Sequence, residues 1–420
     1  MINRCFNINK AIENKSIFLL GPRQTGKSTL IKKILSNALY LSLLHAQTYR
    51  LLAKNPEILK DWVKAHLQSL SHLRDVNTPN KSHNHVVAVV AIDEIQKLPF
   101  LLDVVQELIE EHPHLRFVLT GSSARKLKKT GVNLLGGRAR KYLLHPLTYN
   151  EFLPFANSQE LQPFETLLQW GGLPSVVTAK SPKRELEDYG GLYLKEEIQA
   201  EAIVRSIGGF SRFIEVAALS NAEQILFSNI ASDAEVPART VREYFQVLED
   251  TLVGKLLPAF QGTKTRKAMS AAKFYFFDVG LANALTYRFS LAKGTSEYGK
   301  AFEHLLWREL ESAIHYFELD LEVQYWRSLS KLEVDFIIYS LEKKEPILAI
   351  EAKAKSIISE RDLKGLLAFS EEFSQIKKLV VSLEPRKRTL ENEIEIWPVE
   401  EFLKNLPDIL LKQTTTNPTI

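Results

Sequence analysis

The stretch IFLLGPRQTGKSTLIKK, residues 17–33, constrains the fold of this chain more than any other. Its first four residues are apolar and predict a short buried strand, and residues 21–28 then fit the pattern G-x-x-x-x-G-K-[ST]. Apolar residues follow at helical spacing: Leu30, Ile31, Ile34 and Leu35. A strand, a glycine-rich loop and a helix in this order cradle phosphate, because the loop amides and the free amides of the first helical turn point at it. The stretch therefore predicts a nucleoside triphosphate site.

This loop supplies most of the residues that we expect to contact nucleotide. Lys27 is expected to reach the β- and γ-phosphates, and the hydroxyl of Ser28 to hold Mg²⁺. We expect ATP and Mg²⁺ as the ligands. The predicted nucleotide contacts are Gly21, Pro22, Arg23, Gln24, Thr25, Gly26, Lys27, Ser28, Thr29, Asp93 and Thr120.

A second apolar run, VVAVVAI at residues 86–92, ends at Asp93 and Glu94. Such a run is typical of a central parallel strand that is buried on both faces. Hydrolysis needs one carboxylate at the end of a neighbouring strand to hold Mg²⁺ and another to polarise the attacking water. We assign these roles to Asp93 and Glu94; the alternative is a solvated turn. Polar residues that end the next strand are candidates for γ-phosphate contacts or for helix caps: Thr120, Ser122 and Ser123.

The chain divides into regions with different patterns. Alternating strands and helices up to residue 150 predict a three-layer parallel α/β domain of the P-loop NTPase type. The following pattern is helical, and residues 222–257 have the helix–turn–helix–strand order of a winged helix. On its second helix, Arg239 and Arg242 are candidates for DNA contacts, although such domains also bind proteins. The expected boundaries are 1–150 for the ATPase domain, 151–265 for a helical lid and winged-helix-like region, 266–410 for a second α/β domain, and 411–420 for a frayed tail.

A basic segment follows the predicted strand 115–119 and contains no acidic residue. Its members are Arg125, Lys126, Lys128, Lys129, Arg138, Arg140 and Lys141. An arginine that reaches the γ-phosphate of a neighbouring subunit stabilises charge in the transition state. Arg138 is the first candidate for this role and Arg140 the second; the alternatives are a solvated loop and a nucleic-acid contact. An arginine supplied in this way predicts a homo-oligomer, with a ring as one form.

Composition narrows the setting of this chemistry. The net charge is +4, but residues 1–160 hold 22 basic and 12 acidic residues, a net of +10, so the remainder carries −6. A basic ATPase half suits phosphate-rich partners such as DNA. A single cysteine excludes a disulfide framework and, with no apolar run long enough to span a membrane, favours a cytoplasmic protein without a membrane role.

The C-terminal region carries a second set of acidic residues. Asp335 lies in one predicted strand, and Glu351 and Lys353 lie two residues apart in the next, so these two share a face. With suitable register, that face also receives Asp335, and the helix 300–315 can add Glu303. Carboxylate oxygens bind Mg²⁺, and Lys353 can steady an attacking water. We therefore predict Glu303, Asp335 and Glu351 as metal ligands, with Asp335, Glu351 and Lys353 in catalysis.

Several motifs together resemble a known family. In the first half these are GPRQTGKST, AIDEIQKLP, LTGSSARKL, HPLTYNEFL and GGLP; in the second they are KFYFFDVGLANAL, AFEHLLWREL, YWRSLSKLEVDF and ILAIEAKA. In this order they resemble a prokaryotic family of AAA+-type ATPases with a C-terminal domain of the PD-(D/E)XK nuclease-like fold. The resemblance covers nearly the whole chain. It implies nucleotide and hydrolysis roles for Lys27, Ser28, Asp93 and Glu94, strengthens Arg138 as the arginine finger, and implies a nuclease-type site in the second half.

Two functions follow from these observations. The first is an ATPase that acts on DNA and is coupled to a Mg²⁺-dependent nuclease-like domain. The second is a nucleotide-operated switch whose C-terminal domain binds a protein or nucleic acid without cleaving it. Metal-dependent cleavage that is lost on substitution of Asp335 or Lys353 would distinguish them.

Overall fold

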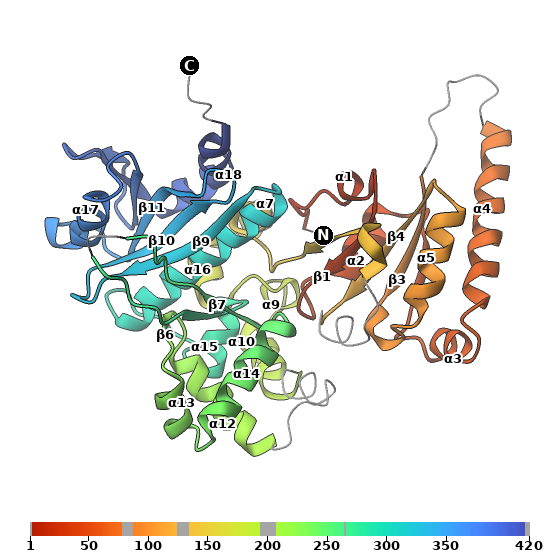
Figure 1. Cartoon of the computed structure of the whole chain (residues 1–420), viewed down its shortest axis with the longest axis horizontal. Helices are drawn as coiled ribbons and strands as arrows, with labels where there is room; N and C mark the ends of the chain where they lie inside the picture. The colour runs from red at the N-terminus through yellow and green to blue at the C-terminus, as the bar shows by residue number, and fades with distance from the viewer. Residues whose placement is uncertain (1, 78–86, 124–133, 194–206, 264–265, 416–420) are drawn as a thin grey trace. The chain divides into compact units, whose positions relative to one another are not determined.

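The computed structural model describes residues 2–77, 87–123, 134–193, 207–263 and 266–415. The chain forms two compact units (Figure 1). The N-terminal unit comprises residues 6–145 with 250–252. The C-terminal unit comprises residues 1–5, 146–249 and 253–420.

A five-stranded parallel sheet forms the centre of the N-terminal unit. Its strands are β1 (Ser16–Leu20), β2 (Leu39–Ser42), β3 (Ala88–Asp93), β4 (Leu115–Gly121) and β5 (Ala139–Leu143), in the spatial order β2-β3-β4-β1-β5. The helices are α1 (Ile8–Ile12), α2 (Lys27–Ile34), α3 (Ala46–Lys54), α4 (Ile58–Asn77) and α5 (Leu101–Glu111). This arrangement confirms the parallel α/β sheet of a P-loop ATPase domain. It also corrects one expectation, because β3 is not adjacent to β1: β4 pairs with both and lies between them.

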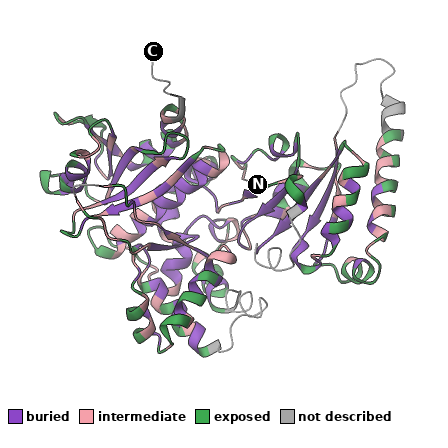
Figure 2. Ribbon diagram, in the orientation of Figure 1, coloured by how far each residue is buried: buried purple, intermediate pink, exposed green. Residues whose placement is uncertain are grey.

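Burial explains why the central strands are continuous apolar runs. Every residue of β1 and of β3 is buried, and Figure 2 shows these central strands in the colour of buried residues. Alternation between apolar and polar residues disappears when both faces of a strand are covered. The helix α5 buries a single stripe against the sheet: Leu101, Leu102, Val104, Val105 and Leu108.

The first part of the C-terminal unit is mainly helical. It contains α7 (Tyr149–Ser158), α8 (Pro163–Trp170), α9 (Pro174–Val177), α10 (Pro182–Asp188), η3 (Tyr189–Tyr193), α12 (Ile207–Leu219), α13 (Phe227–Asp233), α14 (Ala238–Asp250) and α15 (Val279–Leu285). A small antiparallel sheet has the order β6 (Glu223–Gln224), β8 (Lys273–Phe276), β7 (Gly254–Leu257). The helix–turn–helix–strand order is present as α13, α14 and β7. Because β8 pairs with β7, the chain after residue 265 is still joined to this middle region.

The rest of the C-terminal unit is a mixed sheet covered by helices on both faces. The sheet order is β13 (Arg388–Thr389), β14 (Ile394–Pro398), β12 (Lys377–Ser382), β11 (Glu345–Lys353), β10 (Glu333–Ser340), β9 (Leu321–Arg327). The helices α16 (Ser296–Tyr316) and α18 (Val399–Thr415) share one hydrophobic core with this sheet, and η4 (Glu360–Leu363) and α17 (Lys364–Ser370) share another. The helix α18 continues through Thr415, so the expected frayed tail from residue 411 is helical for its first five residues.

Candidate nucleotide and carboxylate sites

The phosphate-binding loop lies between β1 and α2 of the N-terminal unit. The helix begins at Lys27, and its N-cap Gly26 has a φ of 92°, a left-handed conformation that glycine adopts without steric cost. The Lys27 ammonium is buried and donates to the carbonyl oxygens of Gly21 (2.7 Å) and Pro22 (2.9 Å). Thr25 closes the turn by donating to the Pro22 carbonyl (3.0 Å). The loop thus has a defined shape that places the helix N-terminus and Lys27 together.

Asp93, at the end of β3, lies directly beside this loop. Its carboxylate accepts hydrogen bonds from the hydroxyls of Ser28 (3.0 Å), Tyr40 (2.7 Å) and Thr120 (2.5 Å). Burial and the neighbouring carboxylate raise the pKa of Tyr40, so this phenol remains a donor. Tyr40 was missed in the sequence analysis, because nothing in its own surroundings distinguishes it from other residues of a strand.

These residues fit Mg²⁺. The Ser28 hydroxyl donates to Asp93, so the lone pairs of its oxygen remain available to a cation, and Asp93 is a buried carboxylate whose partners are neutral hydroxyls. Mg²⁺ is usually bound by one or two protein oxygens together with phosphate oxygens and water. The structure brings Ser28, Asp93 and Thr120 together, and the oxygens of Ser28 and Asp93 can hold the metal ion of a bound nucleotide.

Glu94 lies at the same edge of the sheet, in a left-handed conformation with a φ of 64°. Its backbone amide donates to the Thr120 hydroxyl (3.1 Å). Its carboxylate accepts from the amide of Gln96 (2.5 Å), which also lies 3.3 Å from the Ser122 hydroxyl. A Cβ at Gly121 would lie 2.6 Å from Gln96 Oε1, so this glycine makes room for the amide. Gln96 therefore fixes the orientation of Glu94. The sequence analysis assigned no role to this residue.

Arg138 lies at the opposite end of the strands from the P-loop, where β1 and β5 begin. It immediately precedes β5, whose first residue pairs with Ser16 at the start of β1, whereas the P-loop follows the end of β1. Five strand residues separate the two ends by about 16 Å. The Arg138 guanidinium is partly exposed and pairs with Glu110 (2.8 Å). Arg138 is therefore at the end of the sheet remote from its own P-loop. Arg140 is an exposed residue of β5.

Only some of the other basic residues singled out in the sequence analysis lie in the part of the chain that the structure describes. Arg125, Lys126, Lys128 and Lys129 lie outside the described residues. In the middle region, Arg239 pairs with Glu243 (3.2 Å) and Arg242 lies over the ring of Phe227 (5.3 Å).

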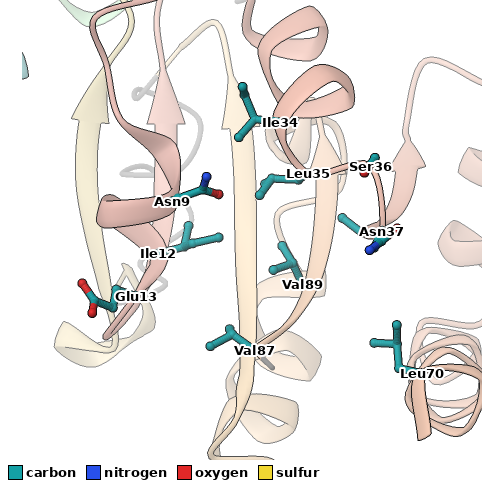
Figure 3. A pocket seen from close by; sticks show the side chains of 11 residues that line it. Asn9, Ile12, Glu13, Ile34, Leu35, Ser36, Asn37, Leu70, Val87 and Val89 are labelled. Atoms are coloured by element: carbon teal, nitrogen blue, oxygen red, sulfur yellow. The ribbon is translucent and has the colours of Figure 1, made fainter. Parts of the chain in front are cut away.

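A pocket of about 330 Å³ occurs in the N-terminal unit, at the edge where β3 begins (Figure 3). Apolar side chains in or next to α1, α2, α4 and β3 line it: Ile12, Ile34, Leu35, Leu70, Val87 and Val89. Glu13 is the single charged side chain among the described residues of its lining. An apolar wall with a carboxylate is unsuited to phosphate, so this pocket is not a second nucleotide site.

The predicted C-terminal residues converge in a carboxylate cluster, which we define as Glu303, Glu333, Asp335 and Glu351 with the cations around them. Asp335 accepts from the backbone amide of Ala352 (2.8 Å), which fixes it against β11. Glu351 is ion-paired with Lys353. Their proximity is visible in the electrostatics, because the Asp335 charge contributes to raising the pKa of Lys353.

The cluster also holds a residue that was missed in the sequence analysis, Lys273 of β8. Its ammonium is buried and lies 2.7 Å from Glu303, 2.5 Å from Glu333 and 3.6 Å from Asp335. The Tyr275 hydroxyl donates to Glu303 as well (2.5 Å). Burial raises the pKa of Glu303 to about 7, against the opposing effect of Lys273. Lys273 has no motif spacing to the acidic residues, which lie at least 30 residues along the chain, so only the fold reveals it.

The cluster does not fit a divalent metal ion in this arrangement. Among the described residues no group of three Asp, Glu, His or Cys side chains is placed to hold a metal ion. Glu303 and Asp335, two of the three predicted ligands, face the Lys273 ammonium, and Glu351 faces Lys353. A bound cation would therefore have to compete with two ammonium groups for the same oxygens.

Family models match successive parts of the chain. Residues 13–153 match an AAA domain, residues 161–292 a domain of unknown function (DUF8612), and residues 298–402 another domain of unknown function (DUF4143). The N-terminal unit is accordingly an AAA-type ATPase domain, joined to a C-terminal domain with a mixed sheet. None of the described helices is long and apolar enough to cross a membrane.

Two uncharacterized proteins resemble the chain over most of its length. One, from Haemophilus influenzae, is 24% identical over 398 residues, which covers 91% of this chain and 92% of the relative. The other, MJ1544 of Methanocaldococcus jannaschii, is 24% identical over 391 residues, with coverages of 87% and 80%.

Solved structures show only a general likeness. The Aeropyrum pernix ORC2 protein with ADPNP and ADP has a TM-score of 0.38 at 14% identity, covering 67% of this chain and 88% of its own. The ORC1 protein of the same organism in complex with DNA has a TM-score of 0.27 at 12% identity, covering 65% and 86%. At these scores nothing about ligands or assembly transfers to this chain.

Proposed function

We propose that this chain, with an AAA-type domain at its N-terminus, binds Mg²⁺-ATP and hydrolyses it. The observation that carries the proposal is the buried Asp93 carboxylate, held by Ser28, Tyr40 and Thr120 beside the P-loop. Lys27 and the amides of α2 bind the phosphates, Ser28 and Asp93 hold the metal ion that accompanies them, and Glu94 orients the attacking water.

Steady-state ATP turnover and equilibrium ATP binding test this proposal together. Lys27→Ala is expected to lose both, since it removes a phosphate contact. Asp93→Asn is expected to lose turnover and the dependence of binding on Mg²⁺. A wild-type chain that binds ATP with Mg²⁺ but never turns it over, alone or with DNA, would contradict hydrolysis.

Arg138 is proposed as the arginine finger of a neighbouring copy. Its place at the end of the sheet remote from its own P-loop supports action in trans, and its exposed pair with Glu110 leaves the guanidinium near the surface. An arginine finger stabilises the charge of the transferring phosphoryl group. The chain is therefore proposed to work as a homo-oligomer in which one copy completes the site of the next, in a ring or an open form.

Mixing inactive variants tests this assignment. Arg138→Ala keeps its P-loop, and Glu94→Gln keeps its arginine, so each is expected to be inactive alone. Random mixing in equal amounts restores about one interface in four, because such an interface needs one intact contribution from each side. Arg140→Ala is the matched control and is expected to retain turnover. Full turnover by Arg138→Ala alone would refute the finger.

DNA is proposed as the partner of the ATPase. The support is the net charge of +10 over residues 1–160, which attracts a polyanion. ATP turnover should then rise with one form of DNA, single-stranded, double-stranded or branched, and the rise should weaken with salt. Turnover that is the same with every form would direct the search to a protein partner.

Two functions remain for the C-terminal domain. Metal-dependent cleavage of DNA is supported by the convergence of Asp335, Glu351 and Lys353 on neighbouring strands. Binding without cleavage, with the ATPase as a nucleotide-operated switch, is favoured by one specific observation: the Lys273 ammonium lies against Glu303, Glu333 and Asp335. We favour the second function on that ground.

A cleavage assay separates the two functions. Intact and nicked DNA are followed with ATP and Mg²⁺ or Mn²⁺, for the wild type, Asp335→Ala and Lys353→Ala. Cleavage by the wild type that both substitutions abolish, while ATP turnover persists, would establish the nuclease. Uncut DNA with retained, DNA-dependent ATP turnover would establish the switch.

A further inference from the structure

We infer that Lys273 is the resident cation of the C-terminal carboxylate cluster and occupies the place that a metal ion takes in a metal-dependent nuclease. The cluster then keeps its arrangement without a divalent ion. This inference rests on the proposal that the C-terminal domain binds without cleaving. It identifies Lys273 as the group that takes the place of the metal ion needed for cleavage.

The ion pairs of Lys273 are the first support. A single ammonium lies within 4 Å of Glu303, Glu333 and Asp335, which come from α16 and β10. Bringing carboxylates from separate elements to one point is what a metal ion does in a protein site. Here the lysine makes the same connection with three N–H donors.

The charge balance of the cluster is the second support. Four carboxylates face three cations, because Arg327 pairs with Glu333 (3.3 Å) and Lys353 pairs with Glu351, in addition to Lys273. With every group ionised, the net charge of the set is −1, from −4 and +3. Oxygens that already face protein cations attract a further divalent ion only weakly, and buried charges are stable only when paired.

The surroundings of Lys273 hold it in place. Its strand β8 is paired on both sides, with β6 and with β7. The ammonium lies 5.3 Å from the centre of the Tyr325 ring, and the Tyr275 ring stacks on Trp307 with centroids 4.7 Å apart. The Tyr275 hydroxyl donates to Glu303, one of the partners of the lysine. Strand pairing and aromatic contacts thus fix the lysine where it meets the carboxylates.

One acceptor of the cluster stays open. Glu351 Oε2 is buried and has no hydrogen-bond partner among the described residues. It belongs to the carboxylate that Lys273 does not contact. A single carboxylate oxygen holds a divalent ion only when most ligands come from elsewhere, so this atom alone does not make a metal site.

Binding of Mn²⁺ to the nucleotide-free full chain, followed by electron paramagnetic resonance, tests the inference. The wild type is compared with Lys273→Met, which is similar in shape but neutral, and with Lys273→Arg, which keeps the charge. Lys300→Met is the matched control, because it removes another ion pair from the same unit, that with Glu223. Any ion at the P-loop contributes equally to all four proteins.

Lys273→Met is expected to bind one additional Mn²⁺ per chain and to gain thermal stability when Mn²⁺ is added. The wild type, Lys273→Arg and Lys300→Met should show neither effect, and Asp335→Asn in the wild-type background should leave Mn²⁺ binding unchanged. If Lys273→Met does not fold, the double variant Lys273→Met/Glu303→Gln, which loses one charge of each sign, takes its place.

Two results would overturn the inference. One is Mn²⁺ bound to the wild type that disappears in Asp335→Asn, and the other is no additional Mn²⁺ on Lys273→Met or on the double variant Lys273→Met/Glu303→Gln. ATP turnover of the same preparations is measured in parallel. A failure of the proposed ATPase would appear as absent wild-type turnover whatever the Mn²⁺ result, so the two failures are distinguishable.

Discussion

Asp93 in the N-terminal unit and Asp335 in the C-terminal unit are both buried aspartates in or beside a sheet, yet their partners differ in kind. Asp93 receives hydrogen bonds from the hydroxyls of Ser28, Tyr40 and Thr120. Asp335 and its neighbours face the ammonium of Lys273. Hydroxyl donors stabilise a carboxylate without cancelling its charge, whereas an ammonium cancels it.

The comparison shows that acidic residues alone do not define a metal site. The hydroxyls around Asp93 leave a full negative charge beside the P-loop, where Mg²⁺ and phosphates belong. The cations around the C-terminal cluster leave little charge for a metal ion. The same residue types therefore favour binding of an added cation at one site and pairing with cations of the protein at the other.

Glu94→Gln should have the largest effect on the ATPase side of this comparison. Removing the residue proposed to polarise the attacking water is expected to lower ATP turnover about 10²–10⁴-fold, the usual contribution of a general base. ATP binding should be retained, because the Asp93 set is unchanged. Turnover and binding are measured with Glu111→Gln, an exposed residue at the end of α5, as the control. Equal turnover in both variants would remove Glu94 from the mechanism.

Lys273→Met should have the largest effect on the C-terminal side. Removing one member of a buried ion pair leaves uncompensated charge and is expected to lower the free energy of unfolding by about 3–5 kcal/mol without metal. Lys300→Met, which breaks a more exposed pair, should cost about 0–1 kcal/mol. Urea unfolding monitored by tryptophan fluorescence reports the loss, since Trp307, Trp326 and Trp397 lie in this unit. Equal losses would mean that the Lys273 pairs contribute no more than a surface pair.

Gln96→Ala should have a smaller effect, again on turnover. It removes the hydrogen bond that orients Glu94, which is worth about 1–2 kcal/mol and corresponds to about a tenfold lower kcat with KM little changed. Gln96→Glu, similar in size, places a second carboxylate beside Glu94 and should lower kcat further. A Gln96→Ala variant with unchanged kcat would show that Glu94 needs no such support.

The last prediction concerns the dependence of stability on pH. Burial raises the pKa of Glu303 from 4.5 to about 7. Between these values the folded chain binds a proton that the unfolded chain releases, so stability should fall as pH rises from about 4.5 to about 7. The slope is at most about 1.4 kcal/mol per pH unit for this group. Urea unfolding of the wild type and Glu303→Gln over this range checks it, and parallel profiles would assign the slope to other groups.

The sequence predicts best where neighbouring residues act together. The P-loop and the Asp93–Glu94 pair follow from local patterns, because a strand, a turn and a helix are fixed within a few residues. The position of β4 between β1 and β3 does not follow, since strand order is set by packing across the sheet.

The partners of the carboxylates were harder to predict. Glu303, Asp335, Glu351 and Lys353 were predicted and are brought together, but their roles as ligands and catalysts remain predictions. Tyr40, Gln96 and Lys273 were missed. Lys273 is the first residue of β8, whose sequence, KFYF, is that of an ordinary buried strand. Only the pairing of β8 and the packing of α16 reveal that its ammonium meets Glu303, so charge compensation is a tertiary property.

The place of Arg138 has a consequence for how such an ATPase would be controlled. Under the proposal that Arg138 is the arginine finger, a P-loop and an arginine at opposite ends of the strands would make the complete site a property of two copies. Turnover per subunit then depends on how many copies are present, rising steeply near the concentration at which they associate. Dilution alone would then lower ATP turnover without an inhibitor. A ligand that binds several copies at once would restore it by bringing them together.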